Sequence, residues 1–305
     1  MTDLSGVDGS RVLVAGDLRA VFLPGQGMLA ASLRHAGREL LRRVDDLDAA
    51  ARKGSTAGIP LLHPWANRLP GPRYRAAGRD VALDTRSPLL HLDEQGLPIH
   101  GVPWARLEWE VVREEQALLA ARLDWNREDL LRLFPFRHRV DLVATLRAGS
   151  LTLETSLWAS GADPVPLSFG FHPYLGIPGA PRAGWRLESP PMRRLVTDRL
   201  GIPTGTTVPF GGIAGALGER AFDDGFALAV PASGFALSGG GWRIGIEFLE
   251  GFPYAQVFAP PGNDLVAVEP MTAPTGALAT GFGLRLVEPG AVFRAAFRVA
   301  ITTDE

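Results

Sequence analysis

The segment Trp242-Arg243-Ile244-Gly245-Ile246-Glu247-Phe248 alternates bulky apolar residues with charged or small ones. Successive side chains of a strand point to opposite faces, so this pattern predicts a strand with one buried face. Further runs with the same period occupy residues 11–15, 79–83, 107–111, 138–146, 151–158 and 293–301. The expected fold class is therefore all-β, with antiparallel strands.

Turn-forming residues are abundant between these runs. The chain has 36 Gly and 25 Pro among 305 residues, and turn clusters lie at residues 70–72, 161–164 and 260–263. This composition is typical of many strands joined by turns. One short helix is predicted around residues 45–52, where Asp45 or Asp46 is placed to cap its start. Residues 175–218, rich in Pro, Gly and Arg, predict long loops with short strands.

No repeat, low-complexity tract or long linker interrupts the sequence. All-β folds of this size can form one domain, so residues 1–305 are expected to be a single domain with few short helices. The N-terminus has no basic stretch leading into an apolar segment, and no apolar run approaches the ~20 residues of a membrane helix. We expect a cytoplasmic protein, either a monomer or a weak homodimer.

Charge and composition exclude several kinds of partner. The formal net charge is −2 and the arginines are spread along the chain, so neither nucleic acid nor an acidic membrane surface is an expected partner. The chain has no cysteine, which excludes disulfides, a thiolate nucleophile and a cysteine-based zinc site. The histidines show no metal-ligand spacing, so neither a metal nor another cofactor is expected.

Two ionisable residues, His172 and Glu269, each precede a proline. Proline pushes the preceding residue towards extended backbone and restricts its movement. A proton donor and a proton acceptor on stiff backbone, far apart in sequence, are what general acid–base catalysis requires. Proline is common in this chain, so the spacing alone leaves a structural reading of both residues open.

Four sequence motifs bear on whether His172 and Glu269 are catalytic. Residues 58–68, Gly-Ile-Pro-Leu-Leu-His-Pro-Trp-Ala-Asn-Arg, resemble the G-x-P-x-L-x-P-x-x-N-R signature of the aldose 1-epimerases, the galactose mutarotase-like family. Residues 99–101, 170–174 and 268–273 resemble the second, third and fourth motifs of that family and occur in the same order. The resemblance spans nearly the whole chain and implies a large antiparallel β-supersandwich.

The resemblance implies a function and the residues that perform it. It matches Glu269 to the general base and His172 to the general acid of pyranose ring opening, which interconverts the α and β anomers without a cofactor. We expect the two groups on opposite sides of the sugar ring, with burial raising the pKa of Glu269. It also matches Arg68 and His100 to residues that bind the sugar.

The resemblance also implies further substrate contacts, and at one of them two neighbouring aspartates can be aligned with the family's residue. Residues 222–226, Phe-Asp-Asp-Gly-Phe, resemble the segment whose aspartate binds sugar hydroxyls, and the match favours Asp223 over Asp224. Asn67 is expected to brace its loop more than to contact the sugar. Three aromatic residues are candidates for a platform beneath the sugar, with core packing as the alternative: Trp65, Trp104 and Tyr174.

The leading hypothesis is an aldose 1-epimerase acting on a free hexose such as glucose or galactose. A hexose-6-phosphate 1-epimerase is the close alternative, because Arg73, Arg75 and Arg79 are available near Arg68 to bind a phosphate. A non-catalytic carbohydrate-binding protein would not need both His172 and Glu269. A glycoside hydrolase normally uses two carboxylates, whereas these motifs supply one.

Two departures from the family pattern bear on the sugar preference. Leu175 stands where the third motif often has phenylalanine, and residues 158–160 replace a segment that usually contains asparagine. Neither position has a proposed catalytic role, so the expected effect is on the shape of the pocket.

Overall fold

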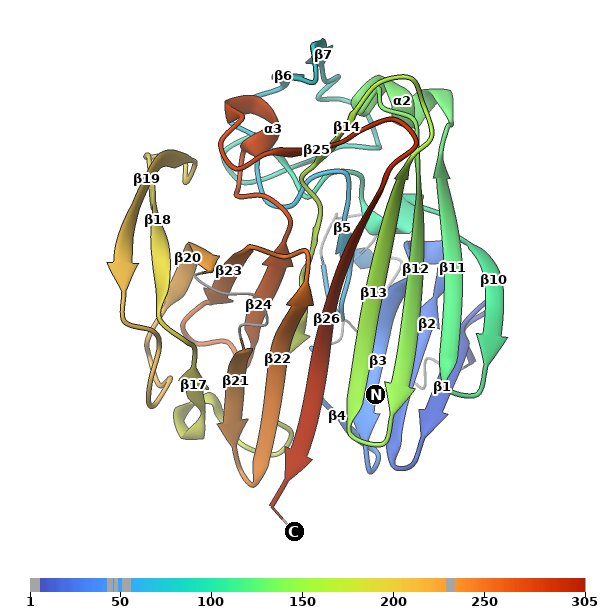
Figure 1. Ribbon diagram of the computed structural model, residues 1–305. Coiled ribbons are helices and arrows are strands. Elements are labelled where there is room, and N and C mark those ends of the chain that lie inside the picture. The colour runs from blue at the N-terminus through green and yellow to red at the C-terminus, as the bar shows by residue number, and fades with distance from the viewer. Residues whose placement is uncertain (1–5, 43–45, 47–48, 51–55, 229–233, 305) are drawn as a thin grey trace.

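The structure is a computed structural model of the chain, and it describes residues 6–42, 46, 49–50, 56–228 and 234–304. Strands dominate it, and they form two large antiparallel sheets with a smaller sheet behind one of them (Figure 1). The expected all-β class and galactose mutarotase-like architecture are confirmed.

The first large sheet, called the front sheet here, has eight strands. In spatial order they are β10 (Glu110–Glu115), β11 (Leu118–Trp125), β12 (His138–Arg147), β13 (Ser150–Ala159), β26 (Val292–Thr303), β22 (Trp242–Glu250), β21 (Gly234–Gly239) and β17 (Arg186–Glu188). A four-stranded sheet packs behind β11 and β12: β1 (Arg11–Ala15), β2 (Leu18–Leu23), β3 (Leu29–His35) and β4 (Arg38–Glu39).

The second large sheet carries the candidate site and is called the site sheet. Its order is β19 (Pro203–Phe210), β18 (Met192–Thr197), β20 (Phe222–Leu228), β23 (Tyr254–Ala259), β24 (Val266–Met271), β15 (Gly170–Phe171) and β5 (Leu61–Leu62), and β16 (Tyr174–Leu175) also pairs with β24. Three two-stranded ladders complete the strands: β6 (Arg73–Ala76) with β7 (Arg79–Ala82), β8 (His91–Leu92) with β9 (Pro98–Ile99), and β14 (Val165–Leu167) with β25 (Arg285–Val287).

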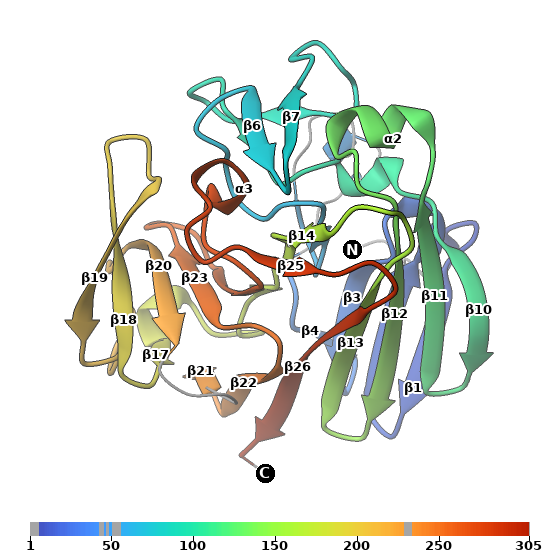
Figure 2. The same cartoon turned by 45° about the horizontal axis from the view of Figure 1, so that its top comes forward.

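Helices are few and short, as expected. The described ones are α2 (Glu128–Leu133), α3 (Ala277–Thr280) and the 3₁₀ turns η2 (Pro24–Gln26), η3 (Trp104–Arg106) and η4 (Arg182–Gly184). Figure 2 shows α2, α3 and the β6–β7 hairpin gathered at one end of the molecule. No helix among the described residues is long and apolar enough to span a membrane.

The predicted strands differ from the structure mainly at their ends. The pattern at residues 107–111 predicts a strand, but the chain is irregular until Glu110, because the Trp109 N–H donates to the Pro24 carbonyl instead of a neighbouring strand. Residues 175–218 include a well-formed hairpin, β18–β19, as well as loops. Most of the helix predicted at 45–52 lies outside the described residues, although Ala49 N–H does donate to the Asp46 carboxylate, 2.8 Å.

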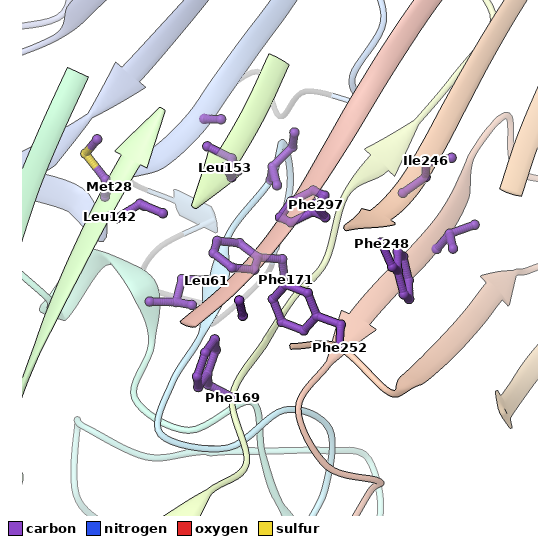
Figure 3. Packing of buried hydrophobic residues seen from close by; sticks show 14 of the residues in the cluster. Met28, Leu61, Leu142, Leu153, Phe169, Phe171, Ile246, Phe248, Phe252 and Phe297 are labelled. Carbon is purple, nitrogen blue, oxygen red and sulfur yellow. The ribbon is translucent and has the colours of Figure 1, made fainter. Parts of the chain in front are cut away.

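Phenylalanines fill the space between the front sheet and the site sheet (Figure 3). Phe171 of β15 lies 5.0 Å from Phe297 of β26 and 6.3 Å from Phe252, measured between ring centroids. All three rings are buried, and contacts between aromatic edges and faces add to the free energy of burial. Because Phe171 directly precedes His172, this core fixes the backbone from which the histidine projects.

Replacement of Phe171 tests this anchor. Phe171→Ala should lower the free energy of unfolding by about 3–5 kcal/mol, since it removes a buried ring and leaves a cavity. Urea denaturation measures the change. The control is Leu286→Ala, whose side chain is 44% exposed, and it should change the same quantity by less than about 0.5 kcal/mol. Equal effects of the two substitutions would contradict the anchoring role.

Candidate active site

His172 and Glu269 lie side by side because their strands pair. Gly170 of β15 is the antiparallel partner of Met271 in β24, and the His172 N–H donates to the Pro60 carbonyl, 3.1 Å. A Cβ at position 170 would lie 2.7 Å from the Pro270 carbonyl oxygen, so only glycine permits this approach. His172 Nε2 lies 3.2 Å from Glu269 Oε1, although 97 residues separate the two in sequence (269 − 172).

The direct contact differs from the expectation that a sugar ring separates the two groups. Both side chains are buried, with exposed fractions of 5% and 2%. The difference has a chemical reason: the anomeric hydroxyl and the ring oxygen of a pyranose are bonded to the same carbon. A donor and an acceptor that touch each other can therefore address both oxygens.

Burial shifts the two pKa values in opposite directions. Loss of water, and then the nearby Asp223 carboxylate, raise the pKa of Glu269 well above its ordinary value, against an opposing effect of Arg68. Loss of water, and then His100, lower the pKa of His172 well below its ordinary value. Both shifts disfavour charge, so they favour a protonated carboxyl beside a neutral imidazole, and the pair then shares one titratable proton in addition to the N–H of the neutral ring.

Each member of the pair also has a polar atom left over. His172 Nδ1 and Glu269 Oε2 are buried and make no hydrogen bond to any described residue. Buried polar atoms are almost always paired, so an unpaired one requires an explanation. Two such atoms beside a shared proton are suited to a polar ligand that donates and accepts hydrogen bonds.

His100 and Asn67 brace each other next to this pair. The Asn67 N–H donates to His100 Nδ1, 3.2 Å, and the His100 N–H donates to the Asn67 carbonyl, 2.9 Å. Both residues have left-handed backbone, with φ of +55° and +61°, which costs energy for residues other than glycine. Because Nδ1 accepts a hydrogen bond, the neutral ring carries its proton on Nε2. Burial is the main cause that lowers the pKa of His100 to about 3.

Arg68 and Asp223 place opposite charges near Glu269. Arg68 Nε donates to Asp93 Oδ2, 2.9 Å, and the positive charge acts on both Glu269 and His100. Asp223 Oδ1 accepts a hydrogen bond from Gln256 Nε2, 2.7 Å. Asp224, its neighbour on β20, lies near Arg194 at 3.9 Å, so Asp223 is the one of the two that acts on Glu269.

The predicted aromatic platform is distributed differently. Tyr174 stacks on His172, with ring centroids 3.9 Å apart and planes 14° apart, and its hydroxyl is hydrogen-bonded to Thr56. Trp104 packs in a small apolar cluster on β2 and β3 and also lines a narrow pocket with His100. Trp65 is fully buried beside Tyr74, so it belongs to the core.

Three residues of the site were not predicted from the sequence: Asp93, Gln256 and Thr56. Gln256 lies opposite Glu269 in the β23–β24 ladder, which places both side chains on one face. It is the only amide in the otherwise apolar and aromatic strand Tyr254–Ala259, a signal that sequence reading could have used. Asp93 begins an Asp-x-x-Gly turn, which by itself reads as ordinary turn chemistry.

The arginines considered for phosphate binding lie elsewhere. Arg73, Arg75 and Arg79 are exposed on the β6–β7 hairpin. Arg75 pairs with Asp80 and Arg79 with Asp163. Among the described residues, no group of three or more His, Asp or Glu side chains is arranged to hold a metal ion.

His63 and His138 form a buried, hydrogen-bonded pair. The Phe136 carbonyl accepts a hydrogen bond from His138 Nδ1, 2.7 Å, so His138 Nε2 is the acceptor for His63 Nε2–H, 2.8 Å. This buried histidine pair lies against Trp125 and Phe134, which fits a role in the core.

Comparison with known proteins defines the class. A family model described as aldose 1-epimerase matches residues 12–300, so the chain belongs to the aldose 1-epimerase family. One curated relative, the uncharacterized protein YphB of Escherichia coli strain K12, is 29% identical over 139 residues. That match spans 43% of this chain and 43% of the relative, so it covers less than half of either protein.

Solved structures share the fold over almost their whole length. The Slr1438 protein of Synechocystis sp. PCC 6803 is 24% identical with a TM-score of 0.80, and the similarity covers 97% of this chain and 96% of that one. A galactose mutarotase-like protein of Clostridium acetobutylicum is 17% identical with a TM-score of 0.84, covering 96% and 95%. The GalM/aldose epimerase homologue of C. elegans is 18% identical with a TM-score of 0.78, covering 97% and 100%.

The raised pKa of Glu269 predicts how stability depends on pH. A carboxyl whose pKa is higher in the folded than in the unfolded state stabilises the fold fully below its unfolded pKa, and this contribution is lost as pH rises through the folded pKa. Glu269→Gln removes the ionisable group. The melting temperature of this variant, relative to that of wild type, should therefore increase as the pH rises from 5 to 9. Calorimetry across this range measures the difference.

The control for this comparison is Glu128→Gln, because the Glu128 side chain is 89% exposed. Its difference from wild type should stay constant with pH. A constant difference for Glu269→Gln as well would show that Glu269 does not titrate abnormally in the folded protein.

Proposed function

We propose that this member of the family is an aldose 1-epimerase that interconverts the α and β anomers of a free hexose such as glucose or galactose. The observation that carries the proposal is the buried His172–Glu269 contact of 3.2 Å, with one unpaired polar atom on each side chain. A binding protein needs no shared proton at this position. A glycoside hydrolase normally uses a pair of carboxylates that flank the scissile bond, whereas here the carboxylate's partner is an imidazole.

The reaction uses the single proton of the pair. Passage of that proton along the contact gives an imidazolium and a carboxylate, the form in which Glu269 is the base and His172 the acid. Glu269 removes the proton of the C1 hydroxyl, the C1 carbonyl forms, the bond from C1 to the ring oxygen breaks, and His172 protonates that oxygen. After rotation about the C1–C2 bond, the two groups exchange roles and the ring closes on the other face.

The neighbouring residues favour an uncharged sugar as the substrate. The positive charge of Arg68 is balanced by Asp93, and Asp223 adds a carboxylate beside Glu269. A phosphate dianion binds where cations converge, whereas the three arginines considered for it are exposed on the β6–β7 hairpin, and Arg75 and Arg79 are paired with Asp80 and Asp163. Arg68, His100 and Asp223 instead offer the donors and acceptors that sugar hydroxyls require.

Polarimetry of freshly dissolved sugar tests the proposal. The protein should speed the change in optical rotation of α-D-glucose or α-D-galactose, and Glu269→Gln and His172→Asn should each reduce this acceleration by about 10²-fold or more. His35→Asn and Glu128→Gln, which alter a histidine and a glutamate outside the site, are the matched controls and should retain it. Absence of acceleration with every aldose offered would refute the proposed activity.

The opposite pKa shifts predict the pH dependence of the rate. A second proton on the pair removes the acceptor, and His172 resists that proton until well below pH 6.5, its ordinary pKa. Loss of the only proton removes the donor, and Glu269 retains it until well above pH 4.5. The pH profile of kcat/KM for anomerisation should therefore be bell-shaped, with the alkaline limb absent in Glu269→Gln. A wild-type rate that rises steadily with pH would argue for simple base catalysis.

A further inference from the structure

Arg68 is held between two turns that have the same sequence pattern and the same hydrogen bonds. The first turn is residues 93–97, between β8 and β9, and the second is residues 198–202, which joins β18 to β19. Each begins with aspartate, has glycine three residues later and ends with a branched apolar residue. Neither turn is part of the four motifs.

The backbone of the two turns agrees closely. In the first, Asp93 N–H donates to the Leu97 carbonyl, 2.9 Å, and Asp93 Oδ1 accepts from Gln95 N–H and Leu97 N–H, both 2.9 Å. In the second, Asp198 N–H donates to the Ile202 carbonyl, 2.9 Å, and Asp198 Oδ1 accepts from Leu200 N–H, 2.8 Å, and Ile202 N–H, 3.0 Å. The glycines at the fourth position of each turn, Gly96 and Gly201, have φ of +77° and +76°.

The turns contact different nitrogens of the guanidinium. In the first turn, Asp93 Oδ2, the oxygen not used by the backbone, accepts from Arg68 Nε at 2.9 Å. In the second turn, a Cβ built on Gly201 would lie 2.9 Å from Arg68 Nη1, so the glycine lies directly against the arginine. A Cβ on Gly96 would meet no atom within 4 Å. Each turn thus supplies one contact that its counterpart lacks.

The second turn is itself fixed in place. Ile202 is buried, and its Cγ2 lies 3.1 Å from where a Cβ of Gly276 would be, at the start of α3. Figure 1 shows the loop joining β18 and β19 at the same end of the molecule as α3. Burial opposes ionisation of Asp93, but its hydrogen bonds from Leu97 N–H, Arg68 and Gln95 N–H outweigh that effect and lower its pKa. The contact with Arg68 is therefore charge-assisted.

We infer that Asp93 and Gly201 are positioning residues, which hold the Arg68 guanidinium in the orientation that recognises the sugar. The two contacts, of Asp93 Oδ2 with Arg68 Nε and of Gly201 with Arg68 Nη1, are called the Arg68 clamp. With Nε bonded to Asp93, the free donors of Arg68 are those of its terminal nitrogens, and the fit of Gly201 against Nη1 limits rotation of the group. The effect on turnover rests on the proposed function, whereas the clamp itself can be tested without it.

The first experiment uses the repeated turn as its own control. Asp93→Asn keeps the Oδ1 acceptor that the turn requires but replaces the oxygen that accepts from Arg68, and Asp198→Asn makes the same change where the aspartate is exposed and no bond to Arg68 exists. In anomerisation assays, Asp93→Asn should lower kcat/KM by about 10-fold, mainly through KM, while Asp198→Asn stays within about twofold of wild type. Equal effects of both substitutions would overturn the inference for Asp93.

The second experiment uses the paired glycines. Gly96→Ala and Gly201→Ala both place alanine at a left-handed φ, so both should lower thermal stability to a similar extent. Only Gly201→Ala should also lower kcat/KM, because only there does the new methyl group displace Arg68. In an Arg68→Gln background, neither Asp93→Asn nor Gly201→Ala should cause further loss of kcat/KM. Additive losses would overturn the inference.

The third experiment separates the clamp from the activity. The Nε–H resonance of Arg68, assigned from its loss in Arg68→Lys, should be protected from solvent exchange in wild type and in Asp198→Asn, and exchange faster in Asp93→Asn. If this pattern holds but no aldose is anomerised, the clamp stands and the proposed function fails. If the resonance exchanges rapidly in wild type, the clamp is wrong whatever the activity.

Discussion

The close pairing of β15 with β24 at Gly170 and Met271 is the constraint on which the site depends. It brings together two segments remote in the chain, and it does so where a side chain on β15 would collide with the Pro270 carbonyl. Phe171, buried against the front sheet on one side of this junction, prevents β15 from rotating. The imidazole of His172 is therefore held in contact with Glu269.

Burial of the two side chains changes their pKa values in the way that acid–base chemistry requires. In water, histidine and glutamate near neutrality would exist mostly as neutral imidazole and carboxylate. Inside the protein, loss of water raises the pKa of Glu269 and lowers that of His172, so both groups favour their uncharged forms. A site with one proton and two positions for it can act as acid and base in alternation.

The residues around the pair are braced by both backbone and side-chain contacts. Asn67 and His100 adopt left-handed conformations and exchange hydrogen bonds, and Tyr174 stacks behind His172. Arg68 is held by the clamp. Strain at Asn67 and His100 persists because neighbouring strands over-determine those positions, a pattern common at sites that must be organised before a ligand arrives.

The sequence by itself determined the strands and the identities of the principal side chains. Alternation of period two depends only on which residues prefer burial, so β12, β13, β22 and β26 follow from it directly, and the ordered motifs mark His172, Glu269, Arg68 and His100. The sequence left open which of these side chains contact one another and at what distance. That His172 touches Glu269, that Asp223 rather than Asp224 acts on Glu269, and that Gln256 and Asp93 join the site were decided by sheet register and turn packing. These contacts join residues far apart in the chain, and no local preference of either partner encodes them.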